Sequence, residues 1–109
     1  MENKTYLMGI DVGCTNSKVV IFDTNGNIVS HASTPSLRFI HRRAGFEEFD
    51  VDELWAMISK CIHEAIEKAE IDPVQIKGLG VTSFGNGVVF LDDEGRTLAP
   101  GCFSQDYRA

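Results

Sequence analysis

Hydrophobic and polar positions in the first third of the chain follow the pattern of short strands joined by turns. Apolar runs at Tyr6–Ile10 and Val19–Phe22 enclose a polar turn, and both have the length and the β-branched or aromatic content of strands. A third run, Ile28–Ala32, follows Asn25-Gly26, a pair that favours a tight hairpin because both residues tolerate positive φ. The pattern predicts a three-stranded antiparallel meander.

A change of period after Asp50 predicts a long amphipathic helix. Asp50 and Glu53 have the spacing of an N-cap and an N3 acid. The apolar stripe then comprises Val51, Leu54, Trp55, Ile58, Ile62, Ala65, Ile66 and Ala69. We expect Trp55 in the core, Cys61 at the border of the stripe and His63 on the surface. At ~1.5 Å per residue this helix spans ~30 Å, enough to cross one face of a sheet.

The remaining apolar runs complete an α/β pattern. Ile76–Thr82 comes after the helix and is expected to be a central strand parallel to the first strand. The polar turn at Ser83–Gly87 then falls at its carboxyl end, where open α/β sheets bind ligands. Val88–Leu91 predicts another strand, with Thr97–Leu98 pairing back on it.

Between Ser33 and Phe49 no period holds, and this stretch contains a basic cluster of Arg38, Arg42 and Arg43. Such a cluster either faces a substrate or a neighbouring domain or lies in a solvated loop, and the solvated loop is the more common case.

Composition limits the possible functions. A chain of 109 residues is at most one domain, and its net charge of −6 argues against nucleic acid as a partner. No apolar run approaches the ~20 residues of a membrane helix, and the start of the chain does not look like a signal peptide. The three cysteines have no metal-type spacing, so we expect reduced thiols in a cytoplasmic protein without a membrane partner.

The polar turn between the first two strands has the composition of an anion site. Gly13 permits close approach of a ligand, and successive N–H groups of a tight turn form a concave nest for phosphate oxygens. Thr15 and Asn16 add side-chain donors, and Lys18 adds a positive charge. Asp11 would repel phosphate unless a cation lies between them, which indicates Mg²⁺ held mainly through water. We interpret the turn as a nucleotide-phosphate site.

The same stretch, Gly9–Lys18, resembles the first phosphate motif of the actin, Hsp70 and hexokinase superfamily. Three later features are similar to those of FGGY carbohydrate kinases, in the same order and spacing. They are Gly45-Phe46-Glu47 with Asp50 and Trp55, Gly80–Gly87 followed by Leu91-Asp92, and Gln105–Arg108 with its Asp-x-Arg pattern. Within that family the chain looks closest to the L-xylulose kinase-like branch.

The resemblance implies a ribonuclease H-like fold and ATP-dependent phosphorylation of a sugar hydroxyl, a pentulose or a related ketose or polyol, with ATP and Mg²⁺ as cofactors. Asp11 is implied to orient the metal. The residues implied to contact the β- and γ-phosphates are Gly13, Cys14, Thr15 and Asn16, with Lys18 nearby. The residues implied to touch the sugar are Phe84, Gly85, Asn86, Gly87, Ser104 and Asp106. We also expect Asp11 and Asn86 to face a shared hollow.

Two residues depart from the family pattern. Cys14 stands where many relatives have threonine, and a thiol is a poorer donor than a hydroxyl. Ser104 stands where glycerol kinase-like members have tryptophan, which argues against glycerol.

Family members are much longer, and their catalytic base is expected beyond Ala109. Residues 1–109 are therefore interpreted as the amino-terminal portion of the first kinase domain, with no catalytic residue of their own. We expect them to be inactive alone, and either to self-associate through exposed apolar surface or to be disordered toward the tail.

Simpler interpretations stay open at each position. The turn at Asp11–Lys18 would then be a structural hairpin, Asn86 an ordinary turn residue, and Asp106 with Arg108 a surface ion pair. The alternative function is a non-catalytic ATPase-like binding or regulatory module.

Overall fold

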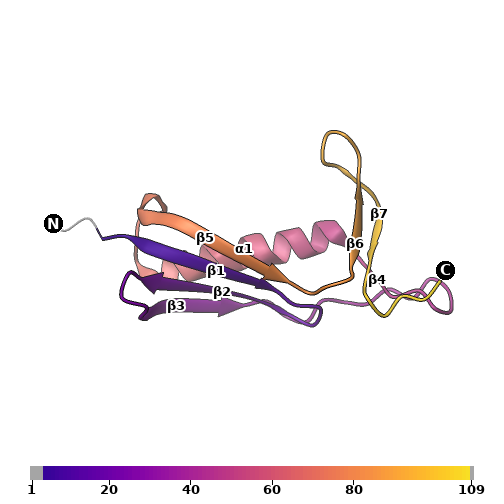
Figure 1. Ribbon diagram of the computed structural model, residues 1–109, viewed down its shortest axis with the longest axis horizontal. Helices are drawn as coiled ribbons and strands as arrows, with labels where there is room; N and C mark the ends of the chain where they lie inside the picture. The colour runs from indigo at the N-terminus through magenta and orange to yellow at the C-terminus, as the bar shows by residue number, and fades with distance from the viewer. Residues whose placement is uncertain (1–3, 109) are drawn as a thin grey trace.

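The computed structural model describes residues 4–108, which form two sheets and one long helix (Figure 1). The first sheet contains β1 (Tyr6–Val12), β2 (Ser17–Asp23), β3 (Ile28–Ser33) and β5 (Ile76–Ser83). The second contains β4 (Glu48–Phe49), β6 (Val88–Leu91) and β7 (Thr97–Cys102). Helix α1 (Val51–Ala69) and a short 3₁₀ helix, η1 (Pro73–Gln75), precede β5. The predicted mixed α/β architecture with a crossover helix is confirmed.

The larger sheet has the strand order β3-β2-β1-β5. The first three strands form the predicted antiparallel meander, and the turn at Gly26 has the positive φ of 84° that its sequence favours. β5 is parallel to β1, as predicted. The prediction that β5 is a central strand is wrong for the described residues, because β5 forms one edge of this sheet. Leu79 and Val81 on β5 are consequently 64% and 60% exposed.

Helix α1 covers one face of the sheet, and its start is the predicted one (Figure 1). The side chain of Asp50 accepts a hydrogen bond of 3.0 Å from the amide of Glu53. The residues of α1 that are fully buried against the strands are Ile58, Cys61 and Ala65. Within residues 4–108, no helix combines the length and the apolar character needed to span a membrane.

Trp55 does not lie in the core. Its side chain is 69% exposed, so the prediction of burial is wrong. Successive residues of a helix are ~100° apart around its axis, and Leu54 and Ile58 are the residues that face the core. Trp55 therefore points away from it. His63 is exposed and Cys61 is buried, as expected.

The small sheet, in the order β4-β7-β6, lies beyond the carboxyl ends of β1 and β5 (Figure 1). The predicted pairing of Thr97–Leu98 with the strand before it is confirmed, and β7 continues to Cys102. A second apolar cluster joins the two sheets. It contains Leu37, Phe49 and Phe103, with Phe39 and Phe84 packed against them. This cluster fixes the position of the small sheet relative to the end of β1.

Candidate functional site

The turn between β1 and β2 is tight. Strand pairing continues to Val12 and Ser17, so the turn consists of four residues, Gly13–Asn16. A Cβ atom added to Gly13 would overlap the carbonyl oxygen of Asn16. Glycine is therefore required at this position by the closeness of the protein's own backbone, whereas from the sequence we expected it to permit the approach of a ligand.

The loop that follows β3 holds this turn from one side. The amide of Ser17 donates to Oγ1 of Thr34 over 2.8 Å, and the amide of Thr34 donates to the carbonyl of Ser17 over 2.9 Å. The amide of Leu37 donates to the carbonyl of Thr15 over 2.7 Å. Thr34 and Leu37 are both buried. Sequence reasoning missed these contacts, since Thr34 marked only the end of a strand.

The amide groups of the turn are available to a ligand. Among residues 4–108, the N–H groups of Gly13, Cys14, Thr15 and Asn16 donate to no protein acceptor. Successive unpaired N–H groups in a turn form a concave site for an anion. The turn therefore has the donors that a phosphate group requires.

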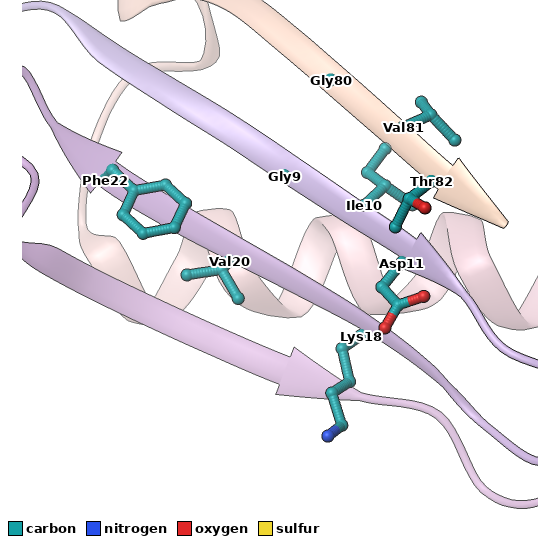
Figure 2. A pocket seen from close by; sticks show the side chains of 9 residues that line it. All are labelled: Gly9, Ile10, Asp11, Lys18, Val20, Phe22, Gly80, Val81 and Thr82. Atoms are coloured by element: carbon teal, nitrogen blue, oxygen red, sulfur yellow. The ribbon is translucent and has the colours of Figure 1, made fainter.

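Asp11, Lys18 and Thr82 lie on the exposed face of the sheet, opposite α1. Side chains alternate along a strand, and Met8 and Ile10 of β1 face the helix, which places Asp11 on the other face. Asp11 is the Cα partner of Lys18 on β2 and of Thr82 on β5. Figure 2 shows these side chains around an open hollow of about 440 Å³. Its full lining is Gly9, Ile10, Asp11, Lys18, Val20, Phe22, Gly80, Val81 and Thr82.

The loop Phe84–Gly87 leaves the sheet beside the turn. The amide of Phe84 donates to the carbonyl of Val12 over 2.9 Å, so the loop begins at the carboxyl end of β1. Asn86 has a φ of 60°, which matches the interpretation of this residue as a turn asparagine. The hydrogen bond between Phe84 and Val12 places the loop at the same end of the sheet as the turn Gly13–Asn16.

The expected shared hollow between Asp11 and Asn86 is not found in the described residues. Phe84 and Gly87 line a separate hollow with Val12, Phe49 and Leu54, on the side of the aromatic cluster. Asp11 lines the hollow on the open face of the sheet instead. Asn86 lines neither of these two hollows, so neither of them joins it to Asp11. Asp11 points to the open face of β1, whereas the ring of Phe84 packs toward Phe49 and Phe103.

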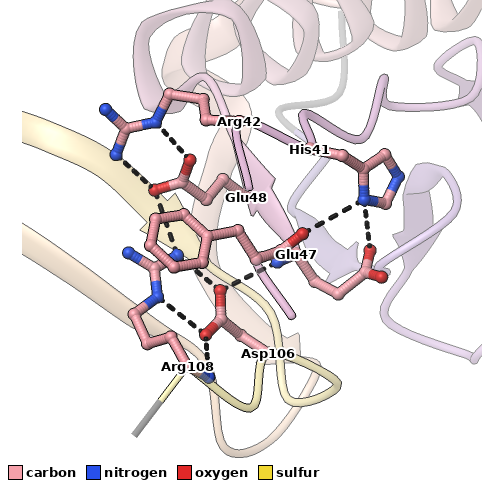
Figure 3. A network of polar contacts seen from close by, with 7 residues as sticks. His41, Arg42, Glu47, Glu48, Asp106 and Arg108 are labelled. Atoms are coloured by element: carbon pink, nitrogen blue, oxygen red, sulfur yellow. Dashed lines mark hydrogen bonds and ion pairs between the residues drawn. The ribbon is translucent and has the colours of Figure 1, made fainter. Parts of the chain in front are cut away.

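Asp106 and Arg108 belong to a larger polar network (Figure 3). Asp106 accepts hydrogen bonds from Nε of Arg108 over 2.8 Å and from the amide of Glu47 over 2.8 Å. Nη2 of Arg108 also lies 3.1 Å from Oε2 of Glu48. The Arg108 guanidinium holds the pKa of the Asp106 carboxyl far below its usual range. The interpretation as an isolated surface ion pair is therefore wrong, since both residues connect to buried structure.

The basic cluster separates into two kinds of residue. Arg38 and Arg43 are exposed, as expected for a solvated loop, and Arg38 lies 4.0 Å from Glu53. Arg42 is also exposed, but unlike the other two it makes two short contacts with the buried Glu48. Ser104 is exposed, with its hydroxyl 3.3 Å from Oε1 of Gln105.

Cys14, Cys61 and Cys102 are free thiols, as predicted, and burial raises the pKa of the Cys61 thiol. Residues 4–108 contain no group of three His, Cys, Asp or Glu side chains placed to hold a metal ion. A single exposed carboxylate such as Asp11 is nevertheless compatible with Mg²⁺, which is commonly held by one or two carboxylates together with water and substrate phosphates.

Almost the whole chain matches known proteins. Residues 6–109 match the model of the FGGY family of carbohydrate kinases, N-terminal domain. A probable L-xylulose kinase of Pasteurella multocida is 38% identical over 104 residues, which are 95% of this chain and 21% of that protein.

Solved structures of carbohydrate kinases have the same fold over this part of their chains. The xylulose kinase from Rhodospirillum rubrum superposes with a TM-score of 0.82 at 25% identity, over 94% of this chain and 21% of that one. The glycerol kinase of Plasmodium falciparum, solved with ADP, superposes with a TM-score of 0.81 at 20% identity, over 96% and 21% of the two chains. The chain thus spans about a fifth of the length of the proteins it matches.

Proposed function

Because the chain belongs to the FGGY family of carbohydrate kinases, we propose that the whole protein transfers the γ-phosphoryl group of ATP to a sugar hydroxyl. The family and its actin/Hsp70/hexokinase-like fold are those predicted from the phosphate turn and the three later motifs. Residues 1–109 would be the amino-terminal portion of the first domain and would supply the phosphate turn and part of the sugar site.

The observation that carries the proposal is the turn Gly13–Asn16. Its four amide groups donate to no protein acceptor among the described residues, and they lie at the end of a hairpin that Thr34 and Leu37 hold in place. Preorganised N–H donors stabilise the charge that develops on a transferring phosphoryl group without reorganising during the reaction. Side chains of Thr15 and Asn16 would add donors. The side chain of Cys14 packs against the cluster of Leu37, Phe49 and Phe103, so Cys14 would contribute its amide rather than its thiol. This arrangement fits the β- and γ-phosphates of ATP.

Asp11 is the residue that would hold Mg²⁺. It is exposed, and it lies beside Lys18 and Thr82 on one face of the sheet (Figure 2). When bound, the ion neutralises negative charge on the β- and γ-phosphates. Asp11 itself would orient the ion through coordinated water, and Lys18 would add positive charge near the phosphates.

The sugar would lie against the loop Phe84–Gly87 and the segment that carries Ser104 and Asp106. Gly85, Asn86 and Ser104 are exposed. Gly85 and Asn86 lie between β5 and β6, in the loop that begins at the carboxyl end of β1, and Ser104 follows β7. We propose a pentulose or a related ketose or polyol as the substrate. The likeness to a probable L-xylulose kinase at 38% identity supports that choice.

The catalytic base and the adenosine contacts would come from other parts of the whole protein. Asp106, on the segment proposed to face the sugar, is not assigned as the base, because its carboxylate is engaged by Arg108 and by the amide of Glu47. The same reasoning predicts that residues 1–109 alone do not turn over ATP. We also propose that the protein is cytoplasmic, where its sugar substrate would be found.

The test is an ADP-release assay on the full-length protein with ATP, Mg²⁺ and a panel of ketopentoses, aldoses and polyols. The proposal predicts ADP release only with one member or a few related members of the panel. Nucleotide binding without turnover on any of them would instead support a non-catalytic binding or regulatory module.

A further inference from the structure

Glu48 is a buried carboxylate with two arginine partners. Its side chain is 1% exposed, although it belongs to the short edge strand β4. Arg42 donates to both oxygens, with Nε 2.6 Å from Oε1 and Nη2 2.8 Å from Oε2. Arg108 approaches Oε2 from the other side. These contacts lower the pKa of Glu48, so it stays ionised at neutral pH. A buried charge that is retained in this way needs both partners in place.

Arg108 and Asp106 connect Glu48 to the end of the described chain. The Arg108 guanidinium lies 3.6 Å from the centre of the Phe46 ring and contacts the carboxylates of Asp106 and Glu48 (Figure 3). Asp106 in turn accepts from the amide of Glu47. The segments around residues 46–48 and 103–108 are therefore joined by charge, hydrogen bonds and stacking, although Glu47 and Asp106 are 59 positions apart in the sequence.

The joined segments lie directly under the proposed sugar-binding surface. The amide of Phe103 donates to the carbonyl of Glu47 over 2.8 Å, and Ser104 is the next residue. The ring of Phe103 lies 5.4 Å from the ring of Phe84, the first residue of the loop Phe84–Gly87. A shift of the 103–108 segment would therefore move both Ser104 and the sugar-side loop.

We propose that Glu48, Asp106 and Arg108 act as positioning residues that set the sugar specificity of the site by fixing Ser104 and the loop Phe84–Gly87. This inference rests on the proposed function. It assigns Asp106 a role different from direct contact with the sugar: its carboxylate is used by Arg108 and by the Glu47 amide. It also predicts that damage to the network affects the sugar more than ATP. The hydrogen bonds that hold the turn Gly13–Asn16 come from Thr34 and Leu37 and from no member of the network, although Leu37 and Cys14 share an apolar cluster with Phe103.

The test compares three variants of the full-length protein. Arg108→Lys keeps the positive charge but loses the planar fork that spans two carboxylates. Asp106→Asn keeps an acceptor for the Glu47 amide but loses the charge that holds Arg108. Arg96→Lys is the matched control, because Arg96 also contacts two carboxylates, those of Asp92 and Glu94, but at the remote β6–β7 hairpin.

The expected result is a rise of about tenfold or more in the KM for the sugar in Arg108→Lys and Asp106→Asn, with the KM for ATP within about twofold of wild type. Amide exchange of the 101–108 segment should accelerate in both, and Arg96→Lys should match wild type in every measurement. These two readouts together distinguish positioning from a general loss of stability, which would affect both KM values alike.

An unchanged sugar KM with unchanged exchange, or equal changes in the KM values for sugar and ATP, would overturn the inference and leave the kinase activity standing. A wild-type protein that phosphorylates no sugar would overturn the proposed function itself. If Asp106→Asn does not fold, Arg108→Lys alone decides between these outcomes.

Discussion

The amide of Ser17 donates to Oγ1 of Thr34 over 2.8 Å, and both residues are buried. This hydrogen bond joins the first residue of β2 to the loop after β3, on the side of the hairpin that carries the phosphate turn. The Ser17 hydroxyl, in contrast, is buried without a hydrogen-bond partner among the described residues. The Thr34 hydroxyl therefore accepts a hydrogen bond from the start of β2, whereas the neighbouring Ser17 hydroxyl makes none within residues 4–108.

Thr34→Val should lower the free energy of unfolding by ~1–3 kcal/mol, because it leaves the Ser17 amide buried without an acceptor. It should also raise the KM for ATP, since the turn Gly13–Asn16 loses one of its supports. Ser17→Ala is the control and should leave stability nearly unchanged, because it removes a hydroxyl that has no partner. Urea unfolding and ATP kinetics of the full-length protein measure both effects. Equal losses in the two variants would contradict the assignment.

Gly13→Ala should abolish ATP use, because the added Cβ overlaps the carbonyl oxygen of Asn16 and forces the turn open. Gly26→Ala is the control at the other turn of the same meander. Gly26 has a φ of 84° with no atom near its Cβ position, so the substitution should cost stability but leave the KM for ATP unchanged. Nucleotide titration followed by fluorescence separates the two. Normal nucleotide affinity in Gly13→Ala would show that this turn is not the phosphate site.

The network around Glu48 predicts a pH dependence of stability. Hydrogen bonds and charge from Arg42 and Arg108 lower the folded-state pKa of Glu48 below its ordinary value of 4.5. The stability that the ionised carboxylate contributes is therefore complete above that value and is lost as pH falls through the lowered pKa. Glu48→Gln should be less stable than wild type at pH 7 and should lose less stability between pH 5 and 3 (roughly the carboxylate range). Denaturant unfolding as a function of pH measures this.

The control for that titration is Glu94→Gln, which removes an exposed carboxylate that contacts Arg96. Its stability should follow wild type across the same pH range, since exposed ion pairs contribute little. If the stability of Glu48→Gln depended on pH in the same way as that of wild type, the pKa of Glu48 would not be lowered by Arg42 and Arg108.

The chain of residues 1–109 should self-associate when prepared alone. Leu79 and Val81 on the edge strand β5 and Leu91 and Leu98 on the β6–β7 hairpin are all more than half exposed. An exposed edge with apolar side chains favours pairing with another copy. Sedimentation should show a concentration-dependent increase in mass that Leu79→Lys reduces and Lys77→Glu, on the same strand, does not. A monomer at all concentrations would contradict this expectation.

Local sequence patterns predicted the elements whose causes are local. The Asp50–Glu53 cap, the Asn25-Gly26 turn and the alternation in the first two strands each depend on neighbours a few residues apart. The order of four motifs, covering nearly the whole chain, then predicted the family. These signals sufficed for the fold and for the position of the turn between β1 and β2.

Features that depend on distant partners were not predictable in the same way. Nothing near Glu48 in the sequence indicates that Arg108 will neutralise it, so its burial could not be foreseen. Trp55 met the period of the helical stripe, yet the register of α1 on the sheet turned it outward. The edge position of β5 likewise depends on which strands pair, and the apolar content of a strand does not decide that.

The most direct measurement is the rate of phosphoryl transfer by full-length Asp11→Asn on the sugar that the wild type phosphorylates. Asp11 is exposed on the open face of the sheet, so the substitution should leave folding intact while removing the carboxylate that would orient Mg²⁺. Asp93→Asn, in the remote β6–β7 turn, is the matched control. We predict a loss of at least about a hundredfold in kcat for Asp11→Asn and none for Asp93→Asn. Full activity in folded Asp11→Asn would contradict a metal–phosphate site at the β1–β2 hairpin.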